Sequence, residues 1–264
     1  MAAQELVWLL VHDVDTEAAK VPLSVRSPFI ESKCIIQYKK GVREMPSDVN
    51  DERIKVFEDP IAYLENIKGR RIIKSHLPLE FLPPKVLDTC KVLYVARNPK
   101  DVVVSFHHHN RILPNHGFIG SFEQFLEMFE DDLHVYGSFW HHLRGGWQQR
   151  DHKNLKFLWF EDMKTDQKAV IKDLCDFLQH PLTEDSVDRL CDHVKFENMR
   201  QNPYVNPSAA KEIQGEDKNF MRKGQVGDWR NYFDDERNQK WTRWIEENTR
   251  GTGLEAVSHI QQIL

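Results

Sequence analysis

A strand, a polar turn and a helix are predicted in succession near the middle of the chain, and this succession constrains the fold most. Residues 93–96 close an apolar run, and Arg97-Asn98-Pro99 interrupts it. Pro99 suits the first turn of a helix, because the N–H that proline lacks would have no partner there. Open α/β sheets bind ligands at the carboxyl ends of their strands. Arg97 is therefore predicted at a binding edge, and Ser105 follows about two helical turns later, where both could face one anion.

Strand and helix patterns alternate along the rest of the chain. Strands are predicted at 71–76, 91–95 and 155–160. Helices are predicted at 2–13, from Asp59-Pro60, from Val102, from Ser121, and at 136–149, 168–178, 184–193 and 234–248. The polar stretch 202–227 is rich in loop formers and is predicted to be a mobile lid. This order predicts the α/β class, with a parallel β-sheet flanked by helices on both faces.

The composition is that of an ordinary globular protein. The 264 residues are 40% hydrophobic and 29% charged, which allows one large domain, 1–264, with a substantial core. The net charge of −5 argues against a broad nucleic-acid-binding surface, so no nucleic-acid partner is expected. Basic residues that matter are expected to act locally.

Cysteine usage and the lack of targeting patterns predict a cytoplasmic protein. Cys34, Cys90, Cys175 and Cys191 have no metal-like spacing and are predicted to be buried thiols in a reducing compartment. The apolar run at 6–11 is too short to span a membrane and lacks the basic lead of a signal peptide. No membrane partner is therefore expected.

Five segments carry a pattern that goes beyond local structure. They are, in chain order, Arg26-Ser27-Pro28-Phe29-Ile30-Glu31, Ile73-Lys74-Ser75-His76-Leu77-Pro78, Val95-Ala96-Arg97-Asn98-Pro99-Lys100-Asp101, Phe160-Glu161-Asp162-Met163 and Phe220-Met221-Arg222-Lys223-Gly224-Gln225-Val226-Gly227-Asp228-Trp229. In their order and spacing these segments resemble those of the cytosolic sulfotransferases. The resemblance runs from about Gln4 to the C-terminus. It implies a single sulfotransferase domain, related in plan to the P-loop nucleotide kinases, that moves a sulfuryl group from the nucleotide PAPS to a hydroxyl or amine of a small acceptor.

The resemblance assigns the catalytic roles to two residues on one predicted strand. Lys74 and His76 are two positions apart, so their side chains would share a face of that strand. His76 would be the general base for the acceptor, because the pKa of histidine lies near working pH. Lys74 would place positive charge near the bridging oxygen as PAPS is cleaved. Without the resemblance, a surface lysine and histidine near a strand end is the simpler interpretation.

The resemblance assigns a larger set of residues to the nucleotide. Those expected at its 3′-phosphate are Arg97, Ser105, Arg222 and Lys223, and Phe220, Met221 and Gly224 belong to the same cofactor-binding segment. Arginine can hold a phosphate through two hydrogen bonds, and glycine lets the backbone approach closely. A solvated basic turn is the alternative for the Arg222-Lys223 pair.

Two aromatic rings fall where the family stacks rings against adenine. These are Phe160, where the family usually has tyrosine, and Phe196. Val194 replaces a common threonine of the family and removes one polar contact. Core packing is the alternative for each phenylalanine.

One family segment has no counterpart in the chain. The resemblance implies a first strand and a Tyr-Pro-Lys-Ser-Gly-Thr-Thr-Trp loop that cradles the 5′ end of the nucleotide, but no Lys-Ser-Gly-Thr or Gly-x-x-x-x-Gly-Lys-Ser/Thr pattern occurs. An N-terminally incomplete domain without its first strand is therefore expected. The alternative function is a catalytically impaired protein that keeps only the 3′-phosphate site. A third alternative, an ATP-using P-loop kinase, is not favoured, because the chain lacks the Walker lysine that such kinases need.

Metal binding and dimerisation are not favoured by the remaining patterns. His107-His108-His109 are adjacent on a predicted helix, so their side chains diverge and cannot converge on one metal ion. The family's dimer motif, Lys-x-x-x-Thr-Val-x-x-x-Glu, is replaced here by residues that include Arg230, Asp234, Asp235 and Gln239. A homodimer through that motif is thus in doubt. The acceptor could be a phenol, alcohol, steroid or amine, and residue types alone do not identify it.

Overall fold

The computed structural model describes residues 1–35, 51–113, 116, 118–206 and 220–262. These residues form two compact units, each assembled from separate stretches of the chain. The first unit comprises Met1–His76, Ile112–Gly117 and Ile171–Gly224. The second unit comprises Leu77–Arg111, Phe118–Val170 and Gln225–Leu264. Each unit is described by itself.

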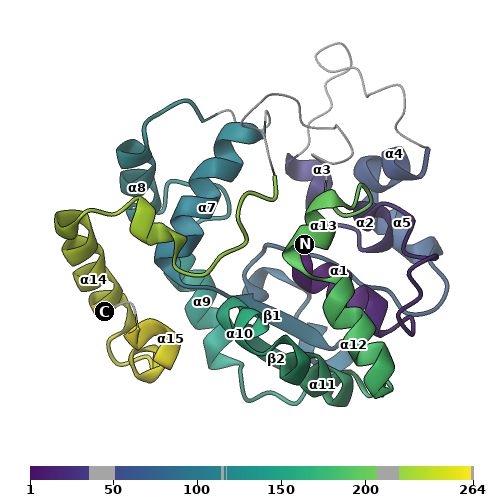
Figure 1. Ribbon diagram of the computed structural model, residues 1–264. Helices are drawn as coiled ribbons and strands as arrows, with labels where there is room; N and C mark the ends of the chain where they lie inside the picture. Colours follow the sequence, from purple (N-terminus) through teal and green to yellow (C-terminus); the bar gives the residue numbers. More distant parts are fainter. Residues whose placement is uncertain (36–50, 114–115, 117, 207–219, 263–264) are drawn as a thin grey trace, which may run out of the picture. The chain divides into compact units, whose positions relative to one another are not determined.

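The first unit is helical in its described part. Its helices are α1 (Ala2–Leu10), α2 (Leu23–Arg26), α3 (Ser32–Ile35), α4 (Asp51–Glu58), α5 (Pro60–Asn66), most of α11 (Gln167–Leu178), α12 (Glu184–His193) and α13 (Phe196–Gln201) (Figure 1). Leu6, Leu9 and Leu10 of α1 are buried, at the spacing of one helix face. This confirms the predicted N-terminal helix and its buried side.

A buried ionic cluster ties three helices of the first unit together. The carboxylate of Glu5 in α1 accepts a hydrogen bond from the Arg26 guanidinium of α2 at 2.7 Å. Its other oxygen lies 2.9 Å from Nε2 of His193, the last residue of α12. Arg26 also lies over the ring of Trp8, 4.4 Å from its centroid. Glu5 is completely buried, so its charge depends on these partners.

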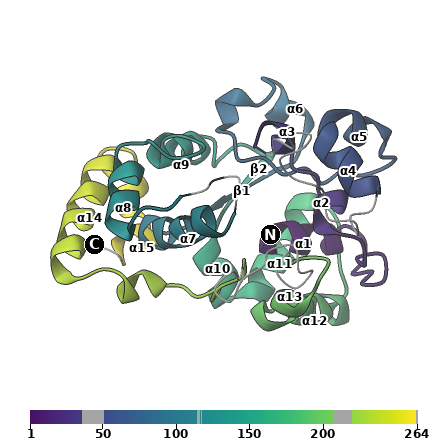
Figure 2. The same cartoon turned by 90° about the horizontal axis from the view of Figure 1, so that it is seen from above.

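The second unit holds the parallel strands. Strands β1 (Val92–Ala96) and β2 (Leu155–Trp159) pair in parallel, with Val92 opposite Leu155 and Ala96 opposite Trp159 (Figure 2). The helices are α6 (Val86–Thr89), α7 (Pro99–Ile112, its last residue in the first unit), α8 (Phe122–Glu130), α9 (Phe139–Gln148), α10 (Phe160–Thr165), α14 (Asp235–Thr249) and α15 (Ser258–Gln261), with 3₁₀ turns at Leu79–Phe81, Asp228–Asn231 and Leu254–Ala256.

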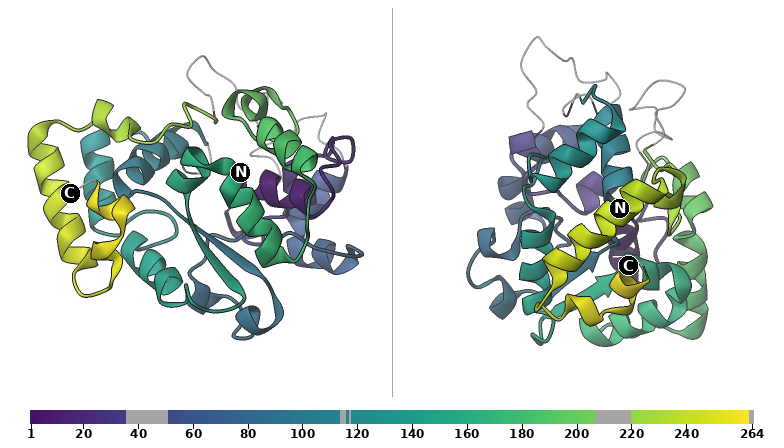
Figure 3. Two further views of the ribbon diagram at one scale, coloured as in Figure 1. Left: turned by 60° about the horizontal axis from the view of Figure 1, so that its bottom comes forward. Right: turned by 90° about the vertical axis from the view of Figure 1, so that its left-hand side faces the viewer.

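Aromatic side chains build much of the core of the second unit. Trp241 is fully buried and packs in a cluster with Phe125 and Phe129 of α8. Ion pairs close the edge of this contact, since Lys240 lies 2.6 Å from Glu130 and Arg237 lies 2.9 Å from Glu123. Helices α8 and α14 consequently lie side by side (Figure 3). The tryptophans at 8, 140, 147, 241 and 244 are buried or half-buried in packing contacts.

Most of the predicted elements are confirmed. Helix α7 begins at Pro99, and α8 begins with a capping box in which Ser121 accepts from the Gln124 N–H and Gln124 accepts from the Ser121 N–H. The predicted helices at 136–149, 168–178, 184–193 and 234–248 correspond to α9, α11, α12 and α14. The fold is α/β, with a small parallel sheet among helices.

Two expectations are wrong. Residues 71–76 form no continuous strand, because Lys74 makes only an isolated parallel bridge with Phe29. The partner segment is short, because α2 ends at Arg26 and a turn at residues 30–31 leads into α3 at Ser32, which leaves no room for a longer ladder. None of the four cysteines forms a disulfide within the described residues, but Cys34 and Cys90 are exposed rather than buried.

Two further expectations concern loops and membranes. Residues 207–219 of the predicted lid lie outside the described residues, and 220–226 have no regular secondary structure. Across the described part of the chain, no helix combines the length and hydropathy that a bilayer crossing requires.

Candidate functional site

The parallel register of the second unit brings Arg97 next to Phe160. Ala96 and Trp159 are paired at the ends of β1 and β2, so Arg97 and Phe160 are the first residues beyond the two strand ends. The Arg97 guanidinium lies over the Phe160 ring, 4.4 Å from its centroid. A cation over an aromatic face is an attractive contact. Two of the predicted nucleotide residues are therefore neighbours at the carboxyl edge of the sheet, where ligands bind in open α/β folds.

A buried carboxylate fixes the surroundings of Arg97. Asp101, in the first turn of α7, accepts hydrogen bonds from the backbone N–H of Gly227 at 2.7 Å and of Trp229 at 3.0 Å. Arg97 lies 3.7 Å from the same carboxylate and donates to the carbonyl of Gln225 at 2.9 Å. The guanidinium is thus oriented from several sides.

An acid of the matching segment Phe160-Glu161-Asp162-Met163 holds the turn after β1. Glu161 is buried, and one of its oxygens accepts from the backbone N–H of Asn98 at 3.0 Å. Burial raises the pKa of this carboxyl, although the Asn98 N–H and the nearby Arg97 charge oppose that rise. Sequence reasoning missed Glu161 and Asp101 as structural partners of Arg97. Their presence in the matching segments was the available signal.

Ser105 lies on α7, as predicted, and its side chain is exposed. An exposed hydroxyl on this helix is accessible to a ligand. The turn at Pro99 and the first two turns of α7 connect Ser105 to Arg97 along the chain.

Lys74 and His76, the predicted catalytic pair, both contact the ring of Phe29 in the first unit. Lys74 Nζ lies over the ring of Phe29, 4.7 Å from its centroid, and the His76 ring packs edge-on against the same ring at 5.1 Å. The backbone sets this contact, because Lys74 donates to the Pro28 carbonyl at 2.9 Å and accepts from the Ile30 N–H at 3.1 Å. Both side chains therefore contact one ring, and the bridge with Phe29 brings two of the matching segments together.

Burial makes Lys74 easier to deprotonate than an ordinary lysine. Desolvation lowers the pKa of Lys74 to about 8, and the Glu31 carboxylate only partly opposes this effect. Glu31 itself is buried and accepts a hydrogen bond from the Ser75 hydroxyl. An ammonium with a pKa near 8 is still mostly charged at neutral pH.

Phe196 and Gly224 are in contact in the first unit. Gly224 has a positive φ of 63°, which L-residues with side chains rarely adopt. A Cβ at this position would lie 2.1 Å from the nearest Phe196 ring atom, so only glycine fits. The backbone at Gly224 therefore closely approaches the ring that is predicted to stack on adenine, whereas its approach to the nucleotide stays a prediction.

The other residues of this cofactor segment precede Gly224 directly in the chain. Phe220, Met221 and Arg222 are half-buried, whereas Lys223 is exposed. They lie in irregular backbone, where the side chains are held less firmly than on a helix.

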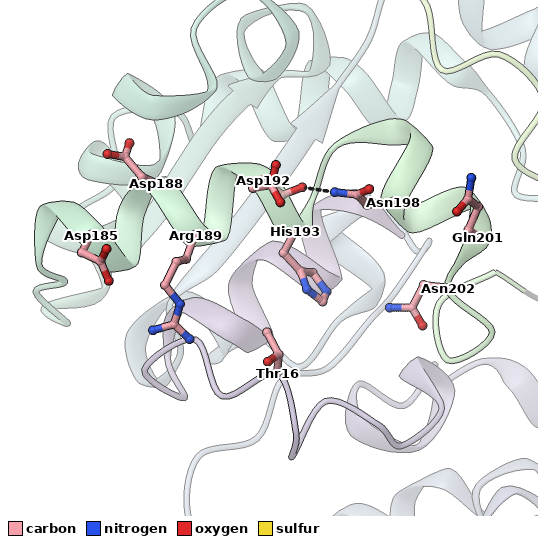
Figure 4. A pocket seen from close by; sticks show the side chains of 9 residues that line it. All are labelled: Thr16, Asp185, Asp188, Arg189, Asp192, His193, Asn198, Gln201 and Asn202. Atoms are coloured by element: carbon pink, nitrogen blue, oxygen red, sulfur yellow. Dashed lines mark hydrogen bonds between the residues drawn. The ribbon is translucent and has the colours of Figure 1, made fainter.

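An open hollow of about 730 Å³ in the first unit contains none of the predicted site residues. It is polar and is lined by Thr16, Asp185, Asp188, Arg189, Asp192, His193, Asn198, Gln201 and Asn202 (Figure 4). Much of its polar lining is used internally. The Asn198 amide donates to the Asp192 carbonyl at 2.7 Å, Arg189 donates to the Val14 carbonyl, and His193 is bound to Glu5.

The adjacent histidines of α7 have an aromatic environment. The His107 ring contacts Phe118, Phe122 and Phe125, with centroids 5.8, 5.2 and 5.4 Å away. Burial among these rings lowers the pKa of His107 to about 4, and the Arg111 and His108 charges act in the same direction. Within the described residues, no group of three histidine, cysteine or acidic side chains could hold a metal ion.

The architecture defines the chain as an α/β protein with a parallel strand pair among helices, and comparison with solved structures agrees. The crystal structure of a retinol dehydratase in complex with androsterone and the inactive cofactor PAP matches it with a TM-score of 0.84, at 33% identity over 95% of this chain and 77% of that one.

Comparison of sequences identifies the family. The sulfotransferase domain model matches residues 1–253. Luciferin sulfotransferase of Photinus pyralis is 33% identical over 260 residues, which cover 95% of this chain and 69% of that protein. Sulfotransferase 1B1 of Mus musculus is 36% identical over 206 residues, 76% of this chain and 68% of that protein. The chain belongs to the sulfotransferase family. By family it is an enzyme that uses the nucleotide PAPS for small-molecule sulfonation.

Proposed function

We propose that this chain transfers a sulfuryl group from PAPS to the hydroxyl or amine of a small acceptor, with His76 as general base and Lys74 beside the bridging oxygen. The single observation that carries these roles is the contact of both side chains with the ring of Phe29. This contact brings a cation and an imidazole to the same apolar ring. Such a ring suits an acceptor that is mainly hydrophobic.

The proposed reaction needs one base and one cation. His76 takes the proton of the acceptor hydroxyl while the acceptor oxygen forms a bond to sulfur. The bond between sulfur and the bridging phosphate oxygen breaks, and its electrons remain on the departing nucleotide, PAP. The Lys74 ammonium stabilises that oxygen. As in phosphoryl transfer, alignment and charge stabilisation contribute more than covalent catalysis by the protein. No metal takes part in this proposal.

The residues proposed for the nucleotide fall into sets, according to the part of the nucleotide that each would bind. Arg97, Ser105, Arg222 and Lys223 would bind the 3′-phosphate, and Phe160 and Phe196 would stack on adenine. Phe220, Met221 and Gly224 would complete the cofactor segment. The contact of Arg97 with Phe160, and that of Gly224 with Phe196, support the assignment because each joins a phosphate-segment residue to a predicted stacking ring.

The acceptor is proposed to be an apolar alcohol or phenol. Among similar proteins, one is a luciferin sulfotransferase, and retinol dehydratase has been crystallised with retinol and with androsterone. The Phe29 ring between Lys74 and His76 would offer such a molecule a flat apolar contact next to the base.

A second candidate function is retention of the 3′-phosphate site without efficient transfer. The observation that favours it is the absence of a Lys-Ser-Gly-Thr segment from the 264 residues. A site that works without such a segment would lack the backbone N–H groups and the lysine that are expected to hold the 5′-phosphosulfate. The nucleotide would then bind mainly through its 3′ end.

Calorimetry with PAP and 5′-AMP, followed by a PAPS turnover assay with a panel of phenols and alcohols, tests both candidates. The transferase proposal predicts tighter binding of PAP, measurable turnover, and loss of turnover in His76→Ala with PAP binding intact. Tight PAP binding without turnover would favour the second candidate. Equal affinity for PAP and 5′-AMP would contradict both.

The remaining assignments follow from the chain's own features. We assign both units to one sulfotransferase domain, because the family match runs through both. The four cysteine thiols, which form no disulfide within the described residues, support a cytoplasmic location. Asp234 accepts the Arg237 N–H at 2.8 Å as the N-cap of α14. Since the altered dimer motif thus has a local role here, a dimer formed through it is not proposed.

A further inference from the structure

The Asp101 carboxylate is the centre of a buried contact set that the proposed mechanism does not yet use. Its side chain is about 1% exposed. One oxygen accepts from the Gly227 N–H at 2.7 Å and the other accepts from the Trp229 N–H at 3.0 Å. The Arg97 guanidinium lies 3.7 Å from the oxygen that binds Gly227. Both oxygens are therefore occupied by fixed donors, and the charge faces an arginine.

The segment that Asp101 holds is also held by Arg97. Arg97 donates to the Gln225 carbonyl at 2.9 Å, two residues before Gly227. Gly227 adopts a positive φ of 80°, which turns the chain so that the N–H groups at 227 and 229 both point at one carboxylate. Gln225 follows Gly224 directly in sequence. The end of the cofactor segment is thus anchored by an acid and an arginine that also contact each other.

The far side of this turn is fixed as well. Lys100, which is fully buried, lies over the Trp229 ring at 4.6 Å. Its ammonium donates to Asn238 at 2.8 Å and to Thr242 at 3.1 Å, both in α14. Because the turn is held from this side too, removal of the Asp101 charge would act mainly on Arg97.

We propose that Asp101 is a positioning residue for recognition of the nucleotide 3′-phosphate. It orients the Arg97 guanidinium and fixes the chain that continues from Arg222-Lys223-Gly224. This proposal rests on the proposed function, because it assumes that Arg97 binds the 3′-phosphate. A carboxylate is required, since two acceptor oxygens serve two N–H donors while its charge directs the arginine.

Asp101→Asn tests the proposal against a purely structural role. The asparagine amide keeps the size but loses one acceptor and the charge. Asp234→Asn is the matched control, because Asp234 also accepts a backbone N–H, at 2.8 Å, and lies 3.8 Å from an arginine. Calorimetric titration with PAP and with 5′-AMP should show PAP affinity reduced roughly tenfold in Asp101→Asn only, with 5′-AMP affinity unchanged in both variants.

The ratio of the two affinities decides the outcome. A folded Asp101→Asn variant that keeps the wild-type preference for PAP overturns the proposal. If that variant does not fold, Asp101→Glu keeps the charge and both oxygens but displaces them by one methylene, and it should also lose PAP preference selectively. Retained preference there overturns the proposal as well. A wild-type chain with no preference for PAP would overturn the 3′-phosphate site itself, and the role of Asp101 with it.

Discussion

The Arg97 guanidinium lies 4.4 Å above the centroid of the Phe160 ring, although 62 residues separate the two positions. The contact exists because β1 and β2 are parallel and in register, so that their carboxyl ends coincide. A residue proposed for the phosphate and one proposed for the base of the same nucleotide thus support each other before any ligand binds. Such preorganisation lowers the ordering cost of binding.

Phe160→Ala should weaken PAP binding more than removal of a stacking ring alone would do. The substitution removes the stacking surface and also the cation–π contact that holds Arg97, each on the order of 1 kcal/mol. We expect a loss of roughly tenfold or more in affinity by calorimetry. Phe160→Tyr keeps the ring and should bind PAP as well as the original chain. Equal binding by the alanine variant would show that Phe160 only packs in the core.

Gly224→Ala should reduce both stability and nucleotide affinity. The added Cβ would meet the Phe196 ring at 2.1 Å, and the positive φ of 63° is unfavourable for alanine. We expect a cost of about 1–3 kcal/mol in unfolding free energy. Gly145→Ala is the control, since nothing lies within 4 Å of a Cβ there and the position is inside α9. That control should gain about 0.5–1 kcal/mol. Chemical denaturation of both variants would decide, and an unchanged Gly224→Ala would contradict the close contact.

Local sequence signals predicted the elements, whereas long-range contacts could not be predicted. Pro99 at a helix start and the Ser121–Gln124 capping box are settled by neighbours within a few residues. The contact of Asp101 with Gly227 spans 126 residues, and no local pattern encodes it. The same holds for Phe29 between Lys74 and His76. The strand expected around Lys74 is only a bridge, because its length depended on a distant partner.

The wrong prediction that Cys34 and Cys90 are buried has a related cause. Free cysteine is on average a buried residue, and adjacent apolar runs favour burial. Cys90 nevertheless follows directly on α6, and Cys34 lies within α3, and both thiols are exposed there. Average behaviour of a residue type does not fix the position of one side chain at a helix end.

Turnover should decrease as pH rises through about 8. Burial lowers the pKa of Lys74 to about 8, and the proposed mechanism needs its protonated form. Deprotonation above that value removes the positive charge at the bridging oxygen, so the contribution of Lys74 to turnover is present below about 8 and lost above it. Lys74→Arg should move this decline to higher pH, because a guanidinium remains charged. Lys20→Arg, at an exposed pair, is the control. If the turnover of Lys74→Arg fell over the same pH range as that of the original chain, the loss of turnover at high pH would belong to another group.

Glu5→Gln should destabilise the first unit strongly, whereas the same substitution at an exposed pair should not. Glu5 is fully buried and lies 2.7 Å from Arg26 and 2.9 Å from His193. Glutamine keeps the shape but leaves the buried Arg26 charge without its counterion, which typically costs about 3–5 kcal/mol.

The control is Glu17→Gln, since Glu17 lies 2.7 Å from Lys20 with both side chains more than half exposed. A surface pair of this kind contributes about 0–1 kcal/mol. Urea denaturation at neutral pH, followed by circular dichroism, should show a much lower midpoint for Glu5→Gln than for Glu17→Gln, with α1 and α12 losing their link first. Phe29 lies in the segment that directly follows α2. Local loosening of α2 in the folded state should therefore also reduce turnover, before the chain unfolds as a whole. Equal midpoints for the two variants would mean that Arg26 finds another counterion, and the buried cluster would then have no special weight in the stability of this unit.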